Sequence, residues 1–275
     1  MSKVIVVTGA GGVLCSTLAK VLAKEGNKVA VLDLRIEAAN KVAEEINKEG
    51  GTAIGVAANV LEKASLDIAK SIVNEKLGTC DVLVNGAGGN HPLGTTSNPY
   101  LLEEDLLNTT EGFKTFFDLD SKGIEFVFNL NFVGTLLPTQ VFAKDMVGKK
   151  GCSILNISSM NAYTPLTKIP AYSGAKAAIS NFTQWLSVHF SKVGIRVNAL
   201  APGFFLTDQN RALLTTEKGE LTPRGNTIIS QTPMGRFGDP EDLVSTTLYL
   251  CDDKSSFVTG VVIPIDGGFS AFSGV

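Results

Sequence analysis

Tyr172 and Lys176 lie four residues apart, within the stretch 170–178. If this stretch is helical, the two side chains lie on one face of the helix, about one turn apart. An ammonium group beside a phenol favours the phenolate, so we expect Lys176 to lower the pKa of Tyr172 from its usual value of about 10. Such a tyrosine could give and take a proton near neutral pH. The same spacing occurs by chance in many helices, so the prediction depends on the motifs that precede it.

A glycine-rich segment lies near the start of the chain. Thr8, Gly9, Gly11 and Gly12 leave an apolar run and enter a helix-like pattern. Glycines would allow the backbone to approach a pyrophosphate, whose charge the amides at the helix N-terminus would bind. The alternative is a tight turn that binds no ligand. In this strand-to-helix context we favour a dinucleotide site.

Asp33 ends the second apolar run, twenty-four residues after Gly9. An acid here would accept hydrogen bonds from the adenosine ribose and repel a 2′-phosphate, which favours NAD over NADP. Arg35 lies two residues further on and could instead accept a phosphate, and Asp33 could also be a solvated acid or a helix cap. The small residues of segment 85–88, after another apolar run, would either approach the cofactor or form an ordinary turn.

Short apolar runs, rich in β-branched residues, alternate with longer amphipathic stretches. The near-continuous apolar character of the short runs is typical of strands buried on both faces, as in a parallel sheet. Strict alternation predicts a doubly wound α/β sheet of Rossmann type with helices on both faces. The expected strands are 4–7, 29–32, 53–56, 82–84, 154–157, 195–200 and 261–265, and the expected helices are 12–25, 36–48, 61–77, 123–147, 170–192 and 239–252.

We find no internal repeat and no linker in the sequence, so we expect a single domain over residues 1–275. Two segments interrupt the alternation of strands and helices. Segment 89–120 is rich in Asn, Thr, Gly and Leu, and segment 203–238 is rich in Gly, Thr, Pro and Arg. Long irregular segments in a compact domain are usually functional loops. We therefore expect both segments to be substrate loops.

The composition is typical of a globular cytoplasmic protein, with 44% hydrophobic and 19% charged residues. The net charge of −3 and the lack of a basic run argue against a nucleic-acid surface. No unbroken apolar stretch of about 18 residues predicts a membrane span. The four cysteines are scattered, which indicates reduced thiols, and the two histidines, His91 and His189, lack the spacing of a metal site.

In their order along the chain, these motifs resemble those of the short-chain dehydrogenase/reductase family. The resemblance extends from Thr8 to Gly268 and implies a single-domain oxidoreductase that uses a nicotinamide cofactor. It is carried by 8–12 (Thr-Gly-Ala-Gly-Gly), 85–88 (Asn-Gly-Ala-Gly), Asn131, Ser158 with Ser159, Tyr172 with Lys176, 202–207 (Pro-Gly-Phe-Phe-Leu-Thr) and 266–268 (Asp-Gly-Gly).

The resemblance implies a role for each matching residue. Tyr172 resembles the catalytic acid/base, and Lys176 resembles its activator and the ligand of the nicotinamide ribose. Ser159, thirteen residues before Tyr172, is expected to bind the reacting oxygen, and Asn131 is expected to hold a proton-relay water. The residues expected to contact NAD, besides Tyr172 and Lys176, are Gly9, Gly11, Gly12, Val13, Leu14, Asp33, Asn59, Val60, Asn85, Ala87, Gly88, Pro202, Gly203, Phe205 and Thr207.

The sequence departs from the family pattern at three places. Val13 and Cys15 occupy two positions where the family loop usually has glycine. Asn59 stands where the family often has an aspartate near the adenine, and its amide could still make that contact. The gap between Asn85 and Asn131 is longer than the family norm, which places an insertion beside the mouth of the expected active site.

Further motifs resemble the D-mannonate oxidoreductase (fructuronate reductase) branch of the family. They are 11–16, 88–92, 129–140, 158–162 and 201–207. The branch implies a sugar-acid substrate, for which the expected contacts are Asn90, His91, Asn161 and Arg211. The alternatives are another aldonate or polyol, such as gluconate, and a non-catalytic protein that senses nucleotides. The resemblance also implies a homodimer or homotetramer that forms through the helix carrying Tyr172.

Overall fold

The computed structural model describes residues 2–207 and 210–274, and within these residues seven parallel strands form one sheet. The strand order is β3-β2-β1-β4-β5-β6-β7, so the order reverses between β1 and β4. In sheets of this kind, ligands bind outside the carboxyl ends of the strands at the reversal. The strands are β1 (Val4–Thr8), β2 (Lys28–Asp33), β3 (Thr52–Ala57), β4 (Val82–Asn85), β5 (Cys152–Ile157), β6 (Ile195–Pro202) and β7 (Val262–Ile265).

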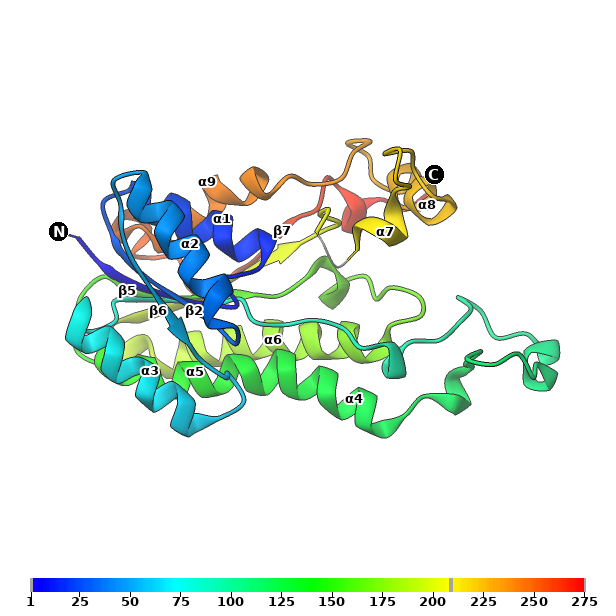
Figure 1. Ribbon diagram of the computed structural model, residues 1–275, viewed down its shortest axis with the longest axis horizontal. Coiled ribbons are helices and arrows are strands. Elements are labelled where there is room, and N and C mark those ends of the chain that lie inside the picture. Colours follow the sequence, from blue (N-terminus) through cyan, green and yellow to red (C-terminus); the bar gives the residue numbers. More distant parts are fainter. Residues whose placement is uncertain (1, 208–209, 275) are drawn as a thin grey trace.

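Helices cover both faces of the sheet (Figure 1). One layer contains α1 (Val13–Lys24), α2 (Ile36–Lys48) and α9 (Val244–Cys251), and the other contains α3 (Lys63–Lys76), α4 (Ser121–Phe128), α5 (Gly134–Phe142) and α6 (Pro170–His189). Two short helices, α7 (Arg211–Leu214) and α8 (Pro223–Ser230), lie within the irregular segment 203–238.

The residues of β1 show why the strands have no polar face. Val4 and Val6 pack into the cluster beneath α3, α5 and α6, whereas Ile5 and Val7 pack into the cluster beneath α1, α2 and α9. Successive side chains of a strand point to opposite faces, and here each face is covered by helices. Both sets must therefore be apolar, and the predicted α/β sheet with helices on both faces is confirmed.

The expected helix 123–147 is interrupted. It consists of α4, a π-helical turn (Asn129–Val133) and α5, followed by a 3-10 turn. By length and composition alone, the run Ser121–Asp145 could span a membrane, but half of it is buried inside the protein. It also carries the buried, polar Asn131, so it serves here as a core helix.

Candidate active site

The first turn of α6 carries Tyr172. Pro170 begins this helix, at a position where the missing amide hydrogen breaks no intrahelical bond. Ser159 lies just beyond the end of β5, and its hydroxyl oxygen accepts a hydrogen bond from the amide of Asn161 at 3.2 Å. Ser159 also lies beside Tyr172, where it acts to lower the pKa of the phenol. The site therefore brings two hydroxyl groups together that could approach a single substrate oxygen.

Lys176 lies one turn after Tyr172, as the spacing predicts. Its Nζ is 5.5 Å from the centre of the Tyr172 ring and donates to the carbonyl of Ile157 at 2.8 Å. The side chain is buried. A β-carbon added to Gly88 would lie 3.2 Å from Lys176 Nζ and 2.6 Å from Asn131 Oδ1. Lys176 and Asn131 therefore approach the same point from two different helices.

Burial sets the protonation of both groups. Removal from water raises the pKa of Tyr172 to about 12, and Ser159 lowers this pKa only in part. Burial also lowers the pKa of Lys176 to about 8. The expected lowering of the Tyr172 pKa is therefore wrong for this structure, because burial of the phenol raises the pKa and the group that acts against this rise is Ser159. Tyr172 is a protonated phenol at neutral pH and can act as a proton donor.

The π-helical turn Asn129–Val133 places Asn131 under the segment that follows β4. Asn131 Nδ2 donates to the carbonyls of Val127 at 2.7 Å and Gly89 at 2.8 Å, and Oδ1 accepts from the amide of Gly89 at 3.3 Å. Turns of this type are common at functional sites. The contacts give Asn131 a positioning role, and the water that would link it to Lys176 stays a prediction.

The loop between β1 and α1 packs closely against the backbone that follows β4. Gly9 has a φ of +64°, which favours glycine, and a β-carbon there would lie 2.8 Å from the Cα of Ala87. Gly12 is the N-cap of α1, and it provides no side chain to cap the amides of Val13 and Leu14. Uncapped amides at a helix N-terminus bind anions, so this end of the sheet suits a pyrophosphate.

Asp33 lies at the end of β2, beside the glycine loop. Its Oδ2 accepts from the amide of Gly11 at 3.0 Å and its Oδ1 accepts from the amide of Arg35 at 3.1 Å. A carboxylate has about four acceptor positions, so capacity remains for a diol. The carboxylate is only partly buried, and it fits the role of a ribose ligand.

Asn59 and Val60 follow β3 and have partners within the protein. The Asn59 amide donates to Glu62 Oε1 at 2.8 Å and its Oδ1 accepts from the amide of Leu61 at 3.0 Å. Asn59 therefore stabilises the turn before α3, and its contact with an adenine stays a prediction. Val60 is buried and would contact a β-carbon added to Gly134 at 3.0 Å.

The segment after β6 is fixed by main-chain contacts. Gly203, which follows Pro202, donates to the carbonyl of Ile265 at 2.9 Å. The Phe205 side chain is buried in the core, so only its backbone could face a ligand. The amide of Thr207 donates to Asn210 Oδ1 at 2.8 Å, which leaves its hydroxyl for a ligand.

Asn161 is the expected substrate contact that lies nearest in sequence to Ser159. It is two residues after Ser159 and is 5% exposed, and its Oδ1 has no hydrogen-bond partner among the residues that the structure describes. Leaving such a buried group unpaired costs about 1–3 kcal/mol. The amide oxygen and nitrogen exchange places when the group rotates, so Asn161 can offer an acceptor or a donor. An unpaired amide at this position indicates a place for a polar ligand.

The other three expected substrate contacts are held differently. His91 Nδ1 accepts from the amide of Leu93 at 3.2 Å, and its ring centre is 5.0 Å from that of Phe126. The exposed Asn90 donates to Thr95 Oγ1 at 3.0 Å. Arg211 is exposed at the start of α7. Substrate contact by these side chains stays a prediction.

Only the first part of segment 89–120 flanks the site. The amide of Thr96 donates to the carbonyl of Lys168 at 2.9 Å, just before α6, and Gly94 lies against Ala171. Beyond these contacts the chain turns outward, away from the sheet (Figure 1). The expected role of segment 89–120 as a substrate loop stays a prediction, and residues 89–96 are the part that lies beside the site.

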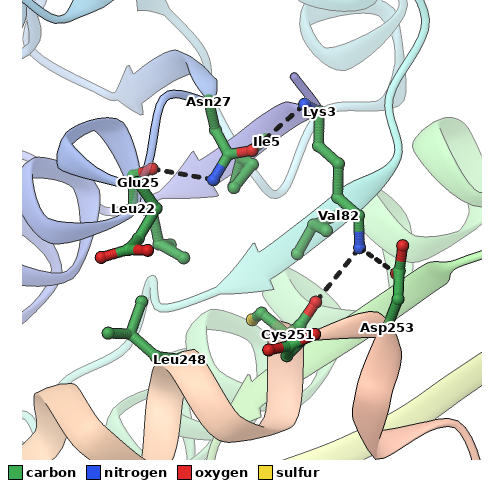
Figure 2. A pocket seen from close by; sticks show the side chains of 10 residues that line it. Lys3, Ile5, Leu22, Glu25, Asn27, Val82, Leu248, Cys251 and Asp253 are labelled. Atoms are coloured by element: carbon green, nitrogen blue, oxygen red, sulfur yellow. Dashed lines mark hydrogen bonds and ion pairs between the residues drawn. The ribbon is translucent and has the colours of Figure 1, made fainter. Parts of the chain in front are cut away.

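A pocket of about 180 Å³ lies at the opposite end of the sheet (Figure 2). The Lys3 side chain lines this pocket. Its Nζ donates to the carbonyl of Cys251 at 3.2 Å and forms an ion pair with Asp253. Its lining contains none of the expected site residues. Among the residues that the structure describes, no three His, Cys, Asp or Glu side chains form a group that could hold a metal ion. The candidate site is therefore the polar cluster at the carboxyl edge.

Residues 3–218 match the sequence profile of the short chain dehydrogenase family. The chain belongs to this family. Its members are NAD(P)-dependent dehydrogenases and reductases that act on small molecules, and this short-chain dehydrogenase is therefore an oxidoreductase.

Several relatives resemble this short-chain dehydrogenase over almost its whole length. An uncharacterised oxidoreductase of Haemophilus influenzae is 61% identical, over all of this chain and 95% of its own. A crystal structure of a protein from Haemophilus influenzae, with NAD bound and provisionally named a D-mannonate oxidoreductase, is 59% identical with a TM-score of 0.93 and covers 99% and 96% of the two chains. A gluconate 5-dehydrogenase from Burkholderia cenocepacia, solved with NADP and tartrate, is 25% identical with a TM-score of 0.83 over 98% and 96%.

One departure of this short-chain dehydrogenase from the family pattern has a structural explanation. Cys15 replaces a glycine of the first loop, and its side chain is buried. A β-carbon added to Gly86 would lie 2.1 Å from Cys15 Sγ and 2.9 Å from the carbonyl oxygen of Thr8. The larger residue on α1 is therefore accommodated because residue 86 has no side chain.

Two contributors to the site were not found from the sequence. The Thr8 hydroxyl accepts from the amides of Gly86 at 3.1 Å and Ala87 at 3.4 Å, and so joins the ends of β1 and β4. The carbonyl of Ile157 fixes Lys176. For Thr8, the sequence showed only that a threonine ends the first strand, which does not reveal the amides that its hydroxyl binds. The carbonyl of Ile157 could not be predicted, because every residue has a main-chain carbonyl.

Proposed function

We propose that this short-chain dehydrogenase uses NAD(H) to interconvert a secondary alcohol and a ketone on a sugar acid, with D-mannonate and D-fructuronate as the pair. The observation that carries the proposal is that Ser159 lies beside Tyr172 and lowers the pKa of the phenol, while the main-chain amide of Asn161 donates to Ser159 Oγ. The relative from Haemophilus influenzae that was solved with NAD supports both the cofactor and the substrate class. The four buried, free cysteines agree with a cytoplasmic location.

When bound, the nicotinamide supplies or accepts the hydride. During reduction, Tyr172 donates its proton to the oxygen that becomes an alcohol, and Ser159 hydrogen-bonds that oxygen and positions it. The phenolate left on Tyr172 is stabilised by Ser159 and by the ammonium of Lys176, 5.5 Å from the ring centre. During oxidation the same groups act in reverse, with Tyr172 as the base.

A sugar acid brings a carboxylate into the site, and leaving it dry and unpaired would cost several kcal/mol. Asn161, two residues after Ser159, is a buried amide whose Oδ1 has no hydrogen-bond partner among the described residues. Arg211 on α7, together with Asn90 and His91 before the insertion, provides further polar groups in the two irregular segments. We assign the carboxylate end of the substrate to Asn161 first.

A spectrophotometric screen of aldonates, uronates and polyols with both cofactors tests the substrate class. Asn161→Ala is expected to raise KM for an acid substrate more than for a neutral polyol of the same length. Asn27→Ala is the matched control, because its amide lies in the pocket at the opposite end of the sheet and is bonded to the carbonyl of Leu22. Equal effects of Asn161→Ala on acid and neutral substrates would move the assignment to neutral sugars or polyols.

The position of Asp33 supports NAD over NADP. Its carboxylate is fixed by the amides of Gly11 and Arg35, where it would repel a 2′-phosphate. Asp33→Ala is expected to narrow the preference for NAD. Comparable kcat/KM with the two cofactors in the unmodified enzyme would overturn this assignment and point to Arg35 as the dominant neighbour.

A dehydrogenase of another aldonate, such as gluconate, is the second candidate. The likeness to the gluconate 5-dehydrogenase from Burkholderia cenocepacia favours it, although at 25% identity. The same screen distinguishes the two by the ratio of kcat/KM for mannonate and gluconate. A protein that only senses nucleotides would bind NADH and leave its absorbance unchanged with every substrate.

A further inference from the structure

Residues 97–118 form an arm that projects beyond the N-terminal ends of α4 and α6 (Figure 1). At its base, the amide of Ser97 donates to the carbonyl of Lys114 at 2.8 Å, and the amide of Lys114 donates to Ser97 Oγ at 2.8 Å. The preceding residue, Thr96, is bonded to Lys168 before α6, and the arm ends just before Asp120, the N-cap of α4. The base of the arm is therefore anchored to both helices.

The arm has a defined shape of its own. Asp105 accepts hydrogen bonds from Asn98 Nδ2 at 3.1 Å and from the amide of Leu102 at 3.0 Å, and Asp118 accepts from Thr115 Oγ1 at 2.6 Å. Of these polar residues Asp105 and Thr115 are buried, whereas large apolar side chains of the arm are exposed. Those exposed by half or more are Tyr100, Leu102, Leu106, Leu107, Phe116 and Phe117.

The total surface agrees with an arm that lacks a partner in the single chain. The chain exposes 13838 Å². A compact monomer of the same 29.0 kDa mass would expose about 11,000 Å². The excess is larger than the roughly 800 Å² that each partner contributes to a typical protein interface. An apolar arm of this size is expected to be covered in the working protein.

The opposite end of the same helical layer has complementary features. Near the C-terminal end of α6, Trp185 is 56% exposed and Val188 is 75% exposed. Lys144, Lys150 and Lys192 are exposed at this end, and none of the ion pairs among the described residues uses them. The arm contains five acidic residues and one lysine, so its charge is opposite.

The helices make the two ends meet in a symmetric pair. The run from α4 to α5 lies parallel to α6, because Val127 packs with Ala171 and Ala175 near one end and the carbonyl of Val193 binds Gly148 at the other. If two copies pack across a two-fold axis on this layer, their helices are antiparallel and each contact occurs twice. The arm of one copy would then reach the basic, apolar end of its partner.

We propose that the arm of one copy packs over Trp185 and Val188 of a second copy, with its acidic residues facing Lys144, Lys150 and Lys192. Apolar anchors at the centre and charged groups at the rim are the usual arrangement of a protein interface. The acidic character of the arm argues against a membrane as its partner, because cytoplasmic leaflets are negatively charged.

Trp185 is the only tryptophan of the chain and therefore reports on this contact. The double variant Leu107→Ser, Phe117→Ser is expected to weaken self-association by on the order of a hundredfold, since both side chains would be interface anchors. The tryptophan emission should shift to longer wavelength, and acrylamide should quench it more strongly. Tyr249→Ser, on α9 in the other helical layer, removes an exposed aromatic residue and should change neither reading.

A charge exchange identifies the partner as a second copy. Glu103→Lys with Glu104→Lys should reduce the mass measured by sedimentation, and adding Lys150→Glu with Lys192→Glu should restore it. Arm variants that change KM while the mass and the Trp185 emission stay constant would overturn the proposal in favour of a lid over the chain's own site. Arm variants that change none of these readings would overturn it in favour of a different protein partner.

Discussion

At the level of single residues, burial keeps the proton on the Tyr172 phenol and makes the neighbouring Lys176 ammonium easier to deprotonate. The pKa of Tyr172 rises to about 12 and that of Lys176 falls to about 8, both because the groups leave water. At neutral pH the phenol keeps its proton, which suits reduction of a ketone. Oxidation needs the phenolate, so its rate is expected to rise with pH above neutrality.

Replacing Tyr172 by phenylalanine tests the donor directly. The ring and its packing stay, and only the hydroxyl group beside Ser159, with its transferable proton, is lost. We expect kcat to fall far below a tenth of its value, while NADH binding, followed by fluorescence, changes little. A variant that keeps more than a tenth of kcat, a barrier change under about 1.4 kcal/mol, would show that another group transfers the proton.

Lys176→Met is expected to stabilise the fold at neutral pH while it damages activity. The folded-state pKa of about 8 lies below the usual 10.5, so at pH 7 the buried ammonium costs roughly 3 kcal/mol. Loss of the bond to the Ile157 carbonyl offsets about 1–2 kcal/mol of this gain. We expect a net increase of about 1–2 kcal/mol in the free energy of unfolding at pH 7.

The pH dependence supplies the control for Lys176→Met. Between the two pKa values the unfolded chain binds a proton that the folded chain does not, so the unmodified protein gains stability as pH rises through this window. The advantage of the methionine variant should therefore shrink between pH 8 and pH 10. Urea denaturation across this range measures it, and a constant difference would show that Lys176 is not discharged by burial.

At the level of elements, the sequence predicts the strands and helices that follow from a local pattern of apolar residues. Every expected strand is present, with its ends shifted by two residues or fewer, because strands buried on both faces are apolar throughout. The π-helical turn at Asn131 was not predicted, since it depends on tertiary contacts with Gly89. The same is true of the pKa values of Tyr172 and Lys176, which depend on burial that no spacing reveals.

The arm shows a different limit of sequence reasoning. Its length and polar composition predicted a loop near the site, and residues 89–96 do lie there. The outward direction of residues 97–118 depends on how Asp105 and Asp118 bind their neighbours, which composition does not reveal. In the sequence alone, the leucines and phenylalanines of the arm cannot be distinguished from ordinary loop residues. Only the structure shows that they are exposed.

The contact between α1 and the end of β4 allows a test of how Cys15 is accommodated. Gly86→Ala would place a β-carbon 2.1 Å from Cys15 Sγ and 2.9 Å from the Thr8 carbonyl. Overpacking of this kind costs about 1–3 kcal/mol, and we expect lower thermal stability and weaker NAD binding. Adding Cys15→Gly should restore part of both, because the contact with Thr8 remains. Additive effects of the two substitutions would show that these residues do not share space.

At the level of the whole molecule, the candidate site and the exposed apolar surfaces lie on different parts of the fold. The candidate active site lies at the carboxyl ends of the strands, and the layer of α4 and α6 ends in the arm. β7 pairs only with β6 among the described strands, and its side chains Val262, Ile263 and Ile265 are partly exposed. An exposed apolar edge strand can pair with another chain. We therefore expect the arm and the β7 edge to be the surfaces that additional copies would cover.

Self-association should therefore contribute to the stability of the folded chain. Light scattering is expected to give a mass above the 29.0 kDa of one chain at micromolar concentration. Because assembly favours the folded state by mass action, the thermal midpoint should rise by roughly 1–2 °C for each tenfold increase in protein concentration. The measurement should be made without added NAD, since a bound ligand also raises the midpoint. A 29.0 kDa particle with a constant midpoint would contradict assembly and leave the arm and the β7 edge exposed to solvent.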